Sequence, residues 1–251
     1  MFRAGVCSVT FRRLPAQEVI RLAARAGLQG IEWGGDIHVP HGNLQVAREV
    51  ARQTREAGLT VSSYGSYYRV GHDEELPFER VLATAKELGA PAVRVWAGKR
   101  GTGDATPDYW ERVVEDSQRI AHAAARERIM LCYEYHGGTL TDNAESAKRL
   151  LEWVNHPAMR TYWQPRAELS PLRNLRELRT VLPWLVNVHV FWWTGSGERR
   201  PLREGQKAWA RFLQVAELAE GARWALLEFV RDDSPEVFLE DARTLIEWLN
   251  R

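Results

Sequence analysis

The feature that most constrains the fold is an alternation of short apolar runs with longer amphipathic stretches, repeated about eight times along the 251 residues. The short runs have the length and composition of buried strands, and the stretches between them have helical periodicity. Each strand–helix unit is roughly 30 residues long, which is the size of a βαβ building block. This pattern indicates an α/β protein with a parallel sheet.

The predicted strands are Arg3–Ser8, Gly30–Trp33, Thr60–Gly65, Ala92–Trp96, Ile129–Glu134, Arg160–Gln164, Leu185–Val190 and Trp224–Phe229. The predicted helices are Ala16–Ala26, Asn43–Ala57, Leu76–Leu88, Asp108–Arg126, Asn143–Val154, Leu172–Val181, Lys207–Leu218 and Pro235–Leu249. A closed barrel or an open doubly wound sheet would accommodate this order. The first strand is not followed by GxGxxG, which removes the main reason to prefer a dinucleotide-binding open sheet. The sequence therefore predicts a (β/α)8 TIM barrel, with residues 1–251 as a single domain.

Composition argues against several classes of protein. The 34 basic and 33 acidic residues nearly cancel, and no dense basic block is present, so a nucleic-acid partner is not expected. No apolar run approaches the roughly 20 residues of a membrane span. The two cysteines, Cys7 and Cys132, lie in strand-like runs, and the N-terminus lacks a signal-cleavage pattern. We therefore expect a cytoplasmic protein with reduced thiols, and leave homo-oligomerisation open.

Strand alternation places polar side chains inside the predicted barrel. Alternate residues of a strand face opposite sides, so the valines of the seventh strand turn His189 inward. The same reasoning turns Arg94 and Trp96 inward from the fourth strand. It also gives Glu134 and Glu228 inward positions near the ends of the fifth and eighth strands.

Four inward residues then meet at one end of the barrel, namely Glu134, Gln164, His189 and Glu228. They end four consecutive strands, and barrel enzymes do their chemistry at that end. Two carboxylates, an imidazole and an amide oxygen suit one divalent metal: Mn²⁺, Mg²⁺, Co²⁺ or Zn²⁺. Taken singly, Gln164 is more typical of a structural hydrogen-bonder than of a ligand, and His189 is equally compatible with a structural role. Two buried carboxylates without a cation would cost several kcal/mol each, which favours the metal.

Five sequence segments carry a resemblance to a known family: GIEWGGDIHVP, YEYHGGTLTDN, TYWQP, NVHVFWW and LLEFVRDD. In motif order and over essentially the whole chain, the sequence resembles the sugar-phosphate isomerase/epimerase family of xylose-isomerase-like barrels. That group also includes inosose dehydratases, ketose 3-epimerases and repair enzymes of the endonuclease IV type. The motifs mark the superfamily and leave the substrate open.

The resemblance implies a set of metal ligands. Family members typically hold the metal with Glu, Asp, His and Glu at the ends of strands five to eight. Carried over, these are Glu134, Gln164, His189 and Glu228. Gln164 departs from the pattern, because an amide replaces the usual aspartate and removes one negative charge. The resemblance thus implies a weaker or more permissive metal site.

The resemblance also implies the chemistry. The metal would polarise a carbonyl and stabilise an enediolate, while Glu134 and Glu228 move a proton from opposing walls. His136 would hydrogen-bond a substrate hydroxyl or the developing oxyanion, or else anchor its own loop.

Several further residues are candidates for substrate contacts. Five tryptophans near strand ends would stack on the C–H faces of a polyol, namely Trp33, Trp96, Trp163, Trp192 and Trp193. His38 and Tyr64 would reach the site from neighbouring loops. Arg231 would bind an acidic group of the substrate or pair with Asp232 or Asp233.

The leading expectation is a metal-dependent isomerase or epimerase acting on a small sugar, sugar acid or inositol-like compound. An inosose-type dehydratase, which is a lyase, would use the same enediolate and is the runner-up. A non-catalytic sugar-binding barrel remains open because of Gln164. A repair endonuclease is disfavoured, because its resembled relatives use a richer histidine cluster and need a basic groove.

Overall fold

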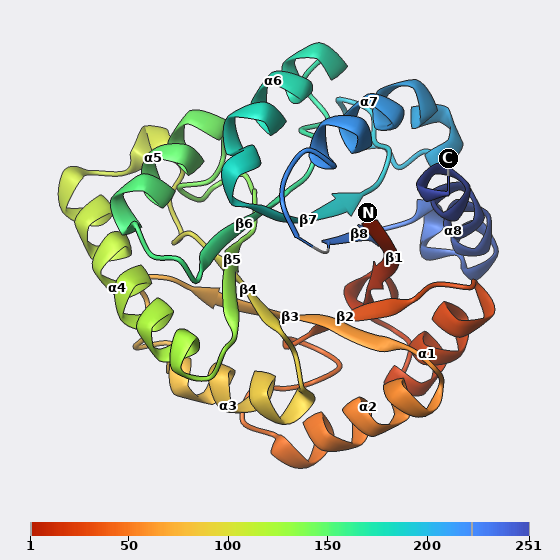
Figure 1. Cartoon of the computed structure of the whole chain (residues 1–251), viewed down its shortest axis with the longest axis horizontal. Coiled ribbons are helices and arrows are strands. Elements are labelled where there is room, and N and C mark those ends of the chain that lie inside the picture. Colours follow the sequence, from red (N-terminus) through yellow and green to blue (C-terminus); the bar gives the residue numbers. More distant parts are fainter. Residues whose placement is uncertain (1, 222, 251) are drawn as a thin grey trace.

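In the computed structural model, which describes residues 2–221 and 223–250, eight parallel strands close into a barrel in the order β1 to β8 (Figure 1). The strands are β1 Phe2–Cys7, β2 Gly30–Gly34, β3 Thr60–Arg69, β4 Ala92–Trp96, β5 Met130–Tyr133, β6 Met159–Trp163, β7 Leu185–Val190 and β8 Arg223–Leu227. The outer helices are α1 Ala16–Arg25, α2 Leu44–Glu56, α3 Phe78–Leu88, α4 Pro107–Arg126, α5 Ala144–Val154, α6 Pro171–Val181, α7 Gln206–Ala216 and α8 Pro235–Leu249. Short 3-10 turns are η1 Ser8–Phe11, η2 Thr102–Asp104, η3 Leu182–Trp184, η4 Leu202–Gly205 and η5 Arg231–Asp233. The single-domain TIM barrel predicted from the sequence is confirmed.

Two strands end two or more residues away from the predicted position. β3 runs on to Arg69, and its pairing with β4 shifts register between Gly65 and Arg69. β8 stops at Leu227, so Glu228 and Phe229 lie just beyond it. Phe229 has a φ of 52°, and this left-handed backbone takes its ring out of the outward row that alternation predicts.

Local signals set the helix ends. Asn143 caps α5 by accepting a hydrogen bond from the Ser146 backbone N–H, and Asn155, with a φ of 42°, ends the same helix. Gly89 ends α3 with a φ of 71°, a conformation that glycine adopts without a Cβ penalty. The turns that follow return the chain to the barrel.

An apolar cluster fills the lower part of the barrel interior, comprising Cys7, Val9, Ala92, Cys132, Tyr162, Trp224 and Leu226. The Trp224 ring needs room that only glycine leaves. A Cβ built on Gly30 would lie 2.5 Å from the ring and 2.8 Å from the Thr60 carbonyl oxygen. The strands therefore close around a packed interior and leave no open channel there.

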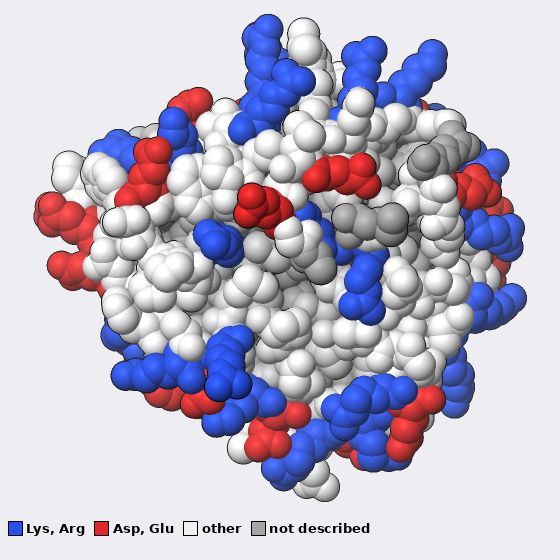
Figure 2. Space-filling model, viewed as in Figure 1, with Lys and Arg blue, Asp and Glu red and all other residues white. Residues whose placement is uncertain are grey.

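The surface carries both signs of charge. On the face shown in Figure 2, basic and acidic side chains alternate around the rim, and neither sign forms a continuous patch there. Within the described residues, no helix is long and apolar enough to cross a membrane.

We expect Gly30→Ala to destabilise the fold by about 1–3 kcal/mol, because the added methyl overpacks a rigid ring and a backbone carbonyl. Gly103→Ala is the matched control, since a Cβ there meets no atom of the described chain within 4 Å. The free energy of unfolding from urea titrations tests this. Equal stability of the two variants would contradict the packing argument.

Candidate active site

Arg94 extends from β4 into the barrel between two carboxylates. Its Nε donates to Glu32 Oε1 at 2.8 Å, and its Nη1 donates to Glu134 Oε2. All three side chains are buried. Ser63 Oγ also donates to Glu32, at 2.8 Å. Gly65 faces the group, and a Cβ there would come within 2.6 Å of Arg94 Nη2, so the absence of a side chain makes room for the guanidinium.

The four residues that the sequence predicts as metal ligands converge on one nitrogen. Nδ1 of His189 lies 2.8 Å from Gln164 Oε1, 3.4 Å from Glu228 Oε2 and 3.9 Å from Glu134 Oε1. His189 is buried, as strand alternation predicts. The ends of β5, β6, β7 and β8 therefore bring these side chains together, Gln164 included.

The charges of Arg94, His189 and the carboxylates shift one another's pKa values. Burial alone would raise the pKa of Glu32, but Arg94, His189 and the Ser63 hydroxyl hold that pKa below its usual value. Burial likewise opposes the charged form of His189, yet Glu228 and the other carboxylates raise the pKa of His189 above its usual value. The pKa of Glu228 is lowered in turn by His189, against the effect of its own burial.

The donor set fits a divalent cation. Glu32, Glu134 and Glu228 are three buried carboxylates, and among the described side chains Arg94 is the permanent cation, paired with Glu32 and Glu134. A second observation is that Nε2 of His189 is buried and has no hydrogen-bond partner in the part of the chain described. Excess negative charge and an unpartnered imidazole nitrogen are features that a bound metal ion would satisfy.

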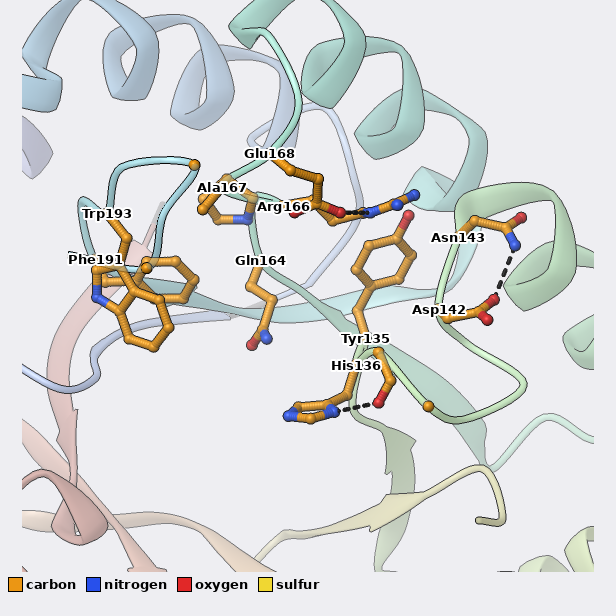
Figure 3. Close-up of a pocket in the computed structure, with 15 residues that line it drawn as sticks. Tyr135, His136, Asp142, Asn143, Gln164, Arg166, Ala167, Glu168, Phe191 and Trp193 are labelled. Carbon is orange, nitrogen blue, oxygen red and sulfur yellow. Dashed lines mark hydrogen bonds and ion pairs between the residues drawn. The ribbon is translucent and has the colours of Figure 1, made fainter. Parts of the chain in front are cut away.

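A cavity of about 550 Å³ adjoins the site at Gln164, which is the member of the predicted ligand set that lines it. In Figure 3, Gln164 lies between Phe191 and Trp193 on one side and Tyr135 and His136 on the other. The cavity is large enough for a small sugar-like molecule, and it places aromatic surface beside the polar group.

Trp96 and His136 form one wall of the mouth. Their rings stack with centroids 4.3 Å apart, and the Arg69 guanidinium lies 3.6 Å from the centroid of the Trp96 ring. His136 Nδ1 is 2.7 Å from the Gly137 carbonyl oxygen, so one ring nitrogen contacts its own loop. The positions of both rings agree with the predicted roles at the mouth, which stay predictions.

Three predicted substrate contacts are wrong because the side chains point away from the barrel. Trp33 donates to Thr54 of α2 at 3.2 Å, and Trp163 packs against Phe212 of α7. Tyr64 donates to the Val39 carbonyl at 2.8 Å. Each follows or precedes an inward residue, so the alternation of the strand turns each of them toward the helices.

Three more predicted contacts have other partners. His38 lies 3.0 Å from both Ser8 Oγ and the Leu14 carbonyl oxygen, which fixes a loop. The Trp192 indole packs against Gly205 of η4, where a Cβ would be 2.7 Å away. Arg231 is exposed and lies 3.4 Å from Asp232, which is the pairing that the sequence leaves as its alternative.

The sequence prediction assigned no role to Glu32, and it placed Arg94 inside the barrel without a partner. The signal for Glu32 was present, since it alternates with the apolar Ile31 and Trp33 in the strand β2. Trp193 is the member of the Trp192–Trp193 pair that lines the cavity.

We expect Arg94→Met to lower the free energy of unfolding of the metal-free protein by about 3–5 kcal/mol, because it leaves two buried carboxylates without a cation. Arg48→Met, which breaks an exposed pair with Glu87, should cost no more than about 1 kcal/mol. Urea unfolding in excess chelator measures both. A similar loss in the two variants would show that Arg94 does not hold the site together.

Comparison with known proteins agrees with the barrel fold. Residues 20–251 match the xylose isomerase-like TIM barrel family. A 3-dehydroshikimate dehydratase from Bacillus anthracis is 23% identical over 204 residues, which cover 74% of this chain and 70% of that protein.

Solved structures share the fold at low sequence identity. A probable 3-DHS dehydratase from Bacillus anthracis superposes with a TM-score of 0.82 and 19% identity, covering 98% of this chain and 99% of the other. A D-psicose 3-epimerase solved in the presence of D-fructose has a TM-score of 0.75 and 17% identity, with 98% of each chain covered. A xylose isomerase-like protein from Mycobacterium smegmatis in complex with magnesium has a TM-score of 0.75 and 17% identity, covering 99% of this chain and 97% of the other. The chain belongs to the xylose isomerase-like TIM barrel family.

Proposed function

We propose that the protein is a divalent-metal-dependent enzyme that removes a proton next to a carbonyl group of a small polyhydroxylated compound. The observation that carries this proposal is the convergence of Gln164, Glu228 and Glu134 on one nitrogen of His189, at the mouth of a barrel. A bound divalent cation would polarise the substrate carbonyl and stabilise negative charge as the proton leaves.

Proton transfer and substrate binding are carried out by side chains of this protein. Glu228 and Glu134 are the carboxylates that would accept the proton, and Arg94 holds one oxygen of Glu134 so that the other faces His189. His136 lies across the mouth and would hydrogen-bond a substrate hydroxyl. The stacked Trp96 ring would exclude water from one side of the substrate.

Two outcomes of this shared step are candidates. With a carboxylate on each side of the carbon, the proton returns to either face, and the enzyme is an isomerase or epimerase. If a hydroxyl on the neighbouring carbon departs instead, the enzyme is a dehydratase. The dehydratase is favoured by the similarity to the 3-dehydroshikimate dehydratase, and it needs only one base together with an acid such as His136.

Solvent deuterium distinguishes the outcomes. Metal-loaded protein is incubated in D₂O with a panel of ketoses, inososes and cyclic β-hydroxy ketones, and the products are followed by NMR. An epimerase or isomerase yields an isomeric sugar that carries deuterium at the exchanged carbon and has kept all its oxygen atoms. A dehydratase yields an unsaturated product that has lost water. Full activity after exhaustive chelation would contradict the proposal.

We expect Glu134→Gln and Glu228→Gln each to lower the rate of that exchange by roughly 10²–10⁴-fold while retaining metal, since an amide oxygen can ligate but cannot accept the proton. Glu152→Gln is the matched control, because this exposed carboxylate lies on α5 and pairs with Lys148 away from the cavity. Exchange at the wild-type rate in both site variants would exclude these carboxylates as bases.

We also expect Gln164→Glu to tighten divalent-metal binding by roughly tenfold or more, because it adds a negative charge to the donor set at unchanged side-chain length. Gln214→Glu adds the same charge on the exposed face of α7 and should leave binding unchanged. Isothermal titration with Mn²⁺ measures both. Weaker binding by the first variant would mean that position 164 is not beside the ion.

A further inference from the structure

Cys7, the last residue of β1, is buried inside the barrel at the edge of the polar group. Its Sγ lies 3.8 Å from Glu32 Oε1. The sulfur, one ring nitrogen of His189 and one carboxylate oxygen of Glu228 all lie within 4.8 Å of one another. Three potential ligand atoms thus cluster on the β1 side of His189, and one of them is a thiol.

The second ring nitrogen of His189 lies near the same carboxylate oxygen of Glu32 as the thiol does. Nδ1 is occupied by Gln164, but Nε2 is fully buried and has no hydrogen-bond partner among residues 2–221 and 223–250. Nε2 lies 3.9 Å from Glu32 Oε1, the same oxygen that Cys7 Sγ approaches. An unpartnered imidazole nitrogen in the interior is costly unless something binds it.

Gln164 is neutral, and one oxygen of Glu134 is already held by Arg94, so neither supplies a free anionic oxygen on that side of the site. Burial and the neighbouring carboxylates raise the pKa of Cys7 above its usual value, so the thiol keeps its proton when no cation is bound. A cysteine that gives up this proton on binding a dication adds a negative ligand, and the proton is released to solvent without any redox change. The result is a set of sulfur, nitrogen and oxygen donors from β1, β7 and the residue after β8.

We propose that Cys7 is a thiolate ligand of the divalent metal, together with His189 and Glu228. This inference rests on the proposed function in requiring a divalent ion at the mouth. It goes further by making the site selective for thiophilic ions, because thiolate ligands favour Zn²⁺ and Co²⁺ over Mg²⁺. It also leaves Glu134, oriented by Arg94, as the carboxylate that is free to move a proton.

Cobalt reports a thiolate ligand directly. The protein is stripped with a chelator, loaded with Co²⁺, and examined by absorption spectroscopy and elemental analysis. We expect one Co²⁺ per chain and a strong thiolate-to-cobalt charge-transfer band in the near ultraviolet. The chain has two cysteines, so variants of each assign the band.

Cys132→Ser is the matched control, because Cys132 is buried in the same interior but is not part of the donor cluster. This variant should keep the band. Cys7→Ser should lose it and bind Zn²⁺ at least roughly tenfold more weakly, with little change for Mg²⁺. Cys7→Ala provides a second test if the serine variant does not fold, and the wild-type spectrum needs no variant at all.

The outcomes separate the two proposals. Stoichiometric Co²⁺ without a thiolate band, or a band that survives in Cys7→Ser, overturns the assignment of Cys7 and leaves the proposed function intact. Absence of binding by Co²⁺, Zn²⁺, Mn²⁺ and Mg²⁺ alike overturns the metal-dependent function as well.

Discussion

Inside the barrel, Arg94 is held between Glu32 and Glu134, and each of these charges would be costly to bury without the others. Because the guanidinium is planar and its donors have fixed directions, it orients both carboxylates at once. Glu134 then presents its second oxygen to His189, which in turn gathers Gln164 and Glu228. The geometry at the mouth is therefore set by three charged groups, from β2, β4 and the residue after β5.

This arrangement also separates two tasks that carboxylates perform in such sites, namely transferring a proton and binding a cation. A carboxylate whose oxygen is tied to a guanidinium is restrained in position, which is what a proton-transferring group needs. Glu228 has His189 as its nearest charged partner and lies just beyond β8. The structure thus contains one carboxylate restrained by Arg94, that of Glu134, and one beside the imidazole of His189, that of Glu228. The two differ in how firmly they are held.

Much of the fold and part of the site could be predicted from the sequence. Strands alternate with a period of two, so His189, Glu134 and Glu228 were placed inside by their apolar neighbours. The same rule excludes Trp33 and Trp163 from the mouth, since each adjoins an inward residue. Their position near a strand end, on which the prediction of substrate contacts was based, is a weaker guide to the direction of a side chain. Beyond the strand ends alternation fails, and the sequence pattern could not tell that Trp193, and not Trp192, faces the cavity. The pairing of Arg94 with Glu32, 62 residues apart, depends on barrel closure and leaves no trace in local periodicity.

The division of the site between strands and loops has a consequence for how such a protein can diversify. Glu32, Arg94 and His189 belong to strands, and Glu134, Gln164 and Glu228 are each the first residue after one. Trp193 and His136, by contrast, lie farther along the segments that follow strands, where insertions and exchanges are tolerated. Substitutions and insertions in these segments can change the shape of the cavity while the charged residues of the strands stay the same. A lineage built on this barrel can therefore acquire new substrates without passing through forms that have lost their reactive centre.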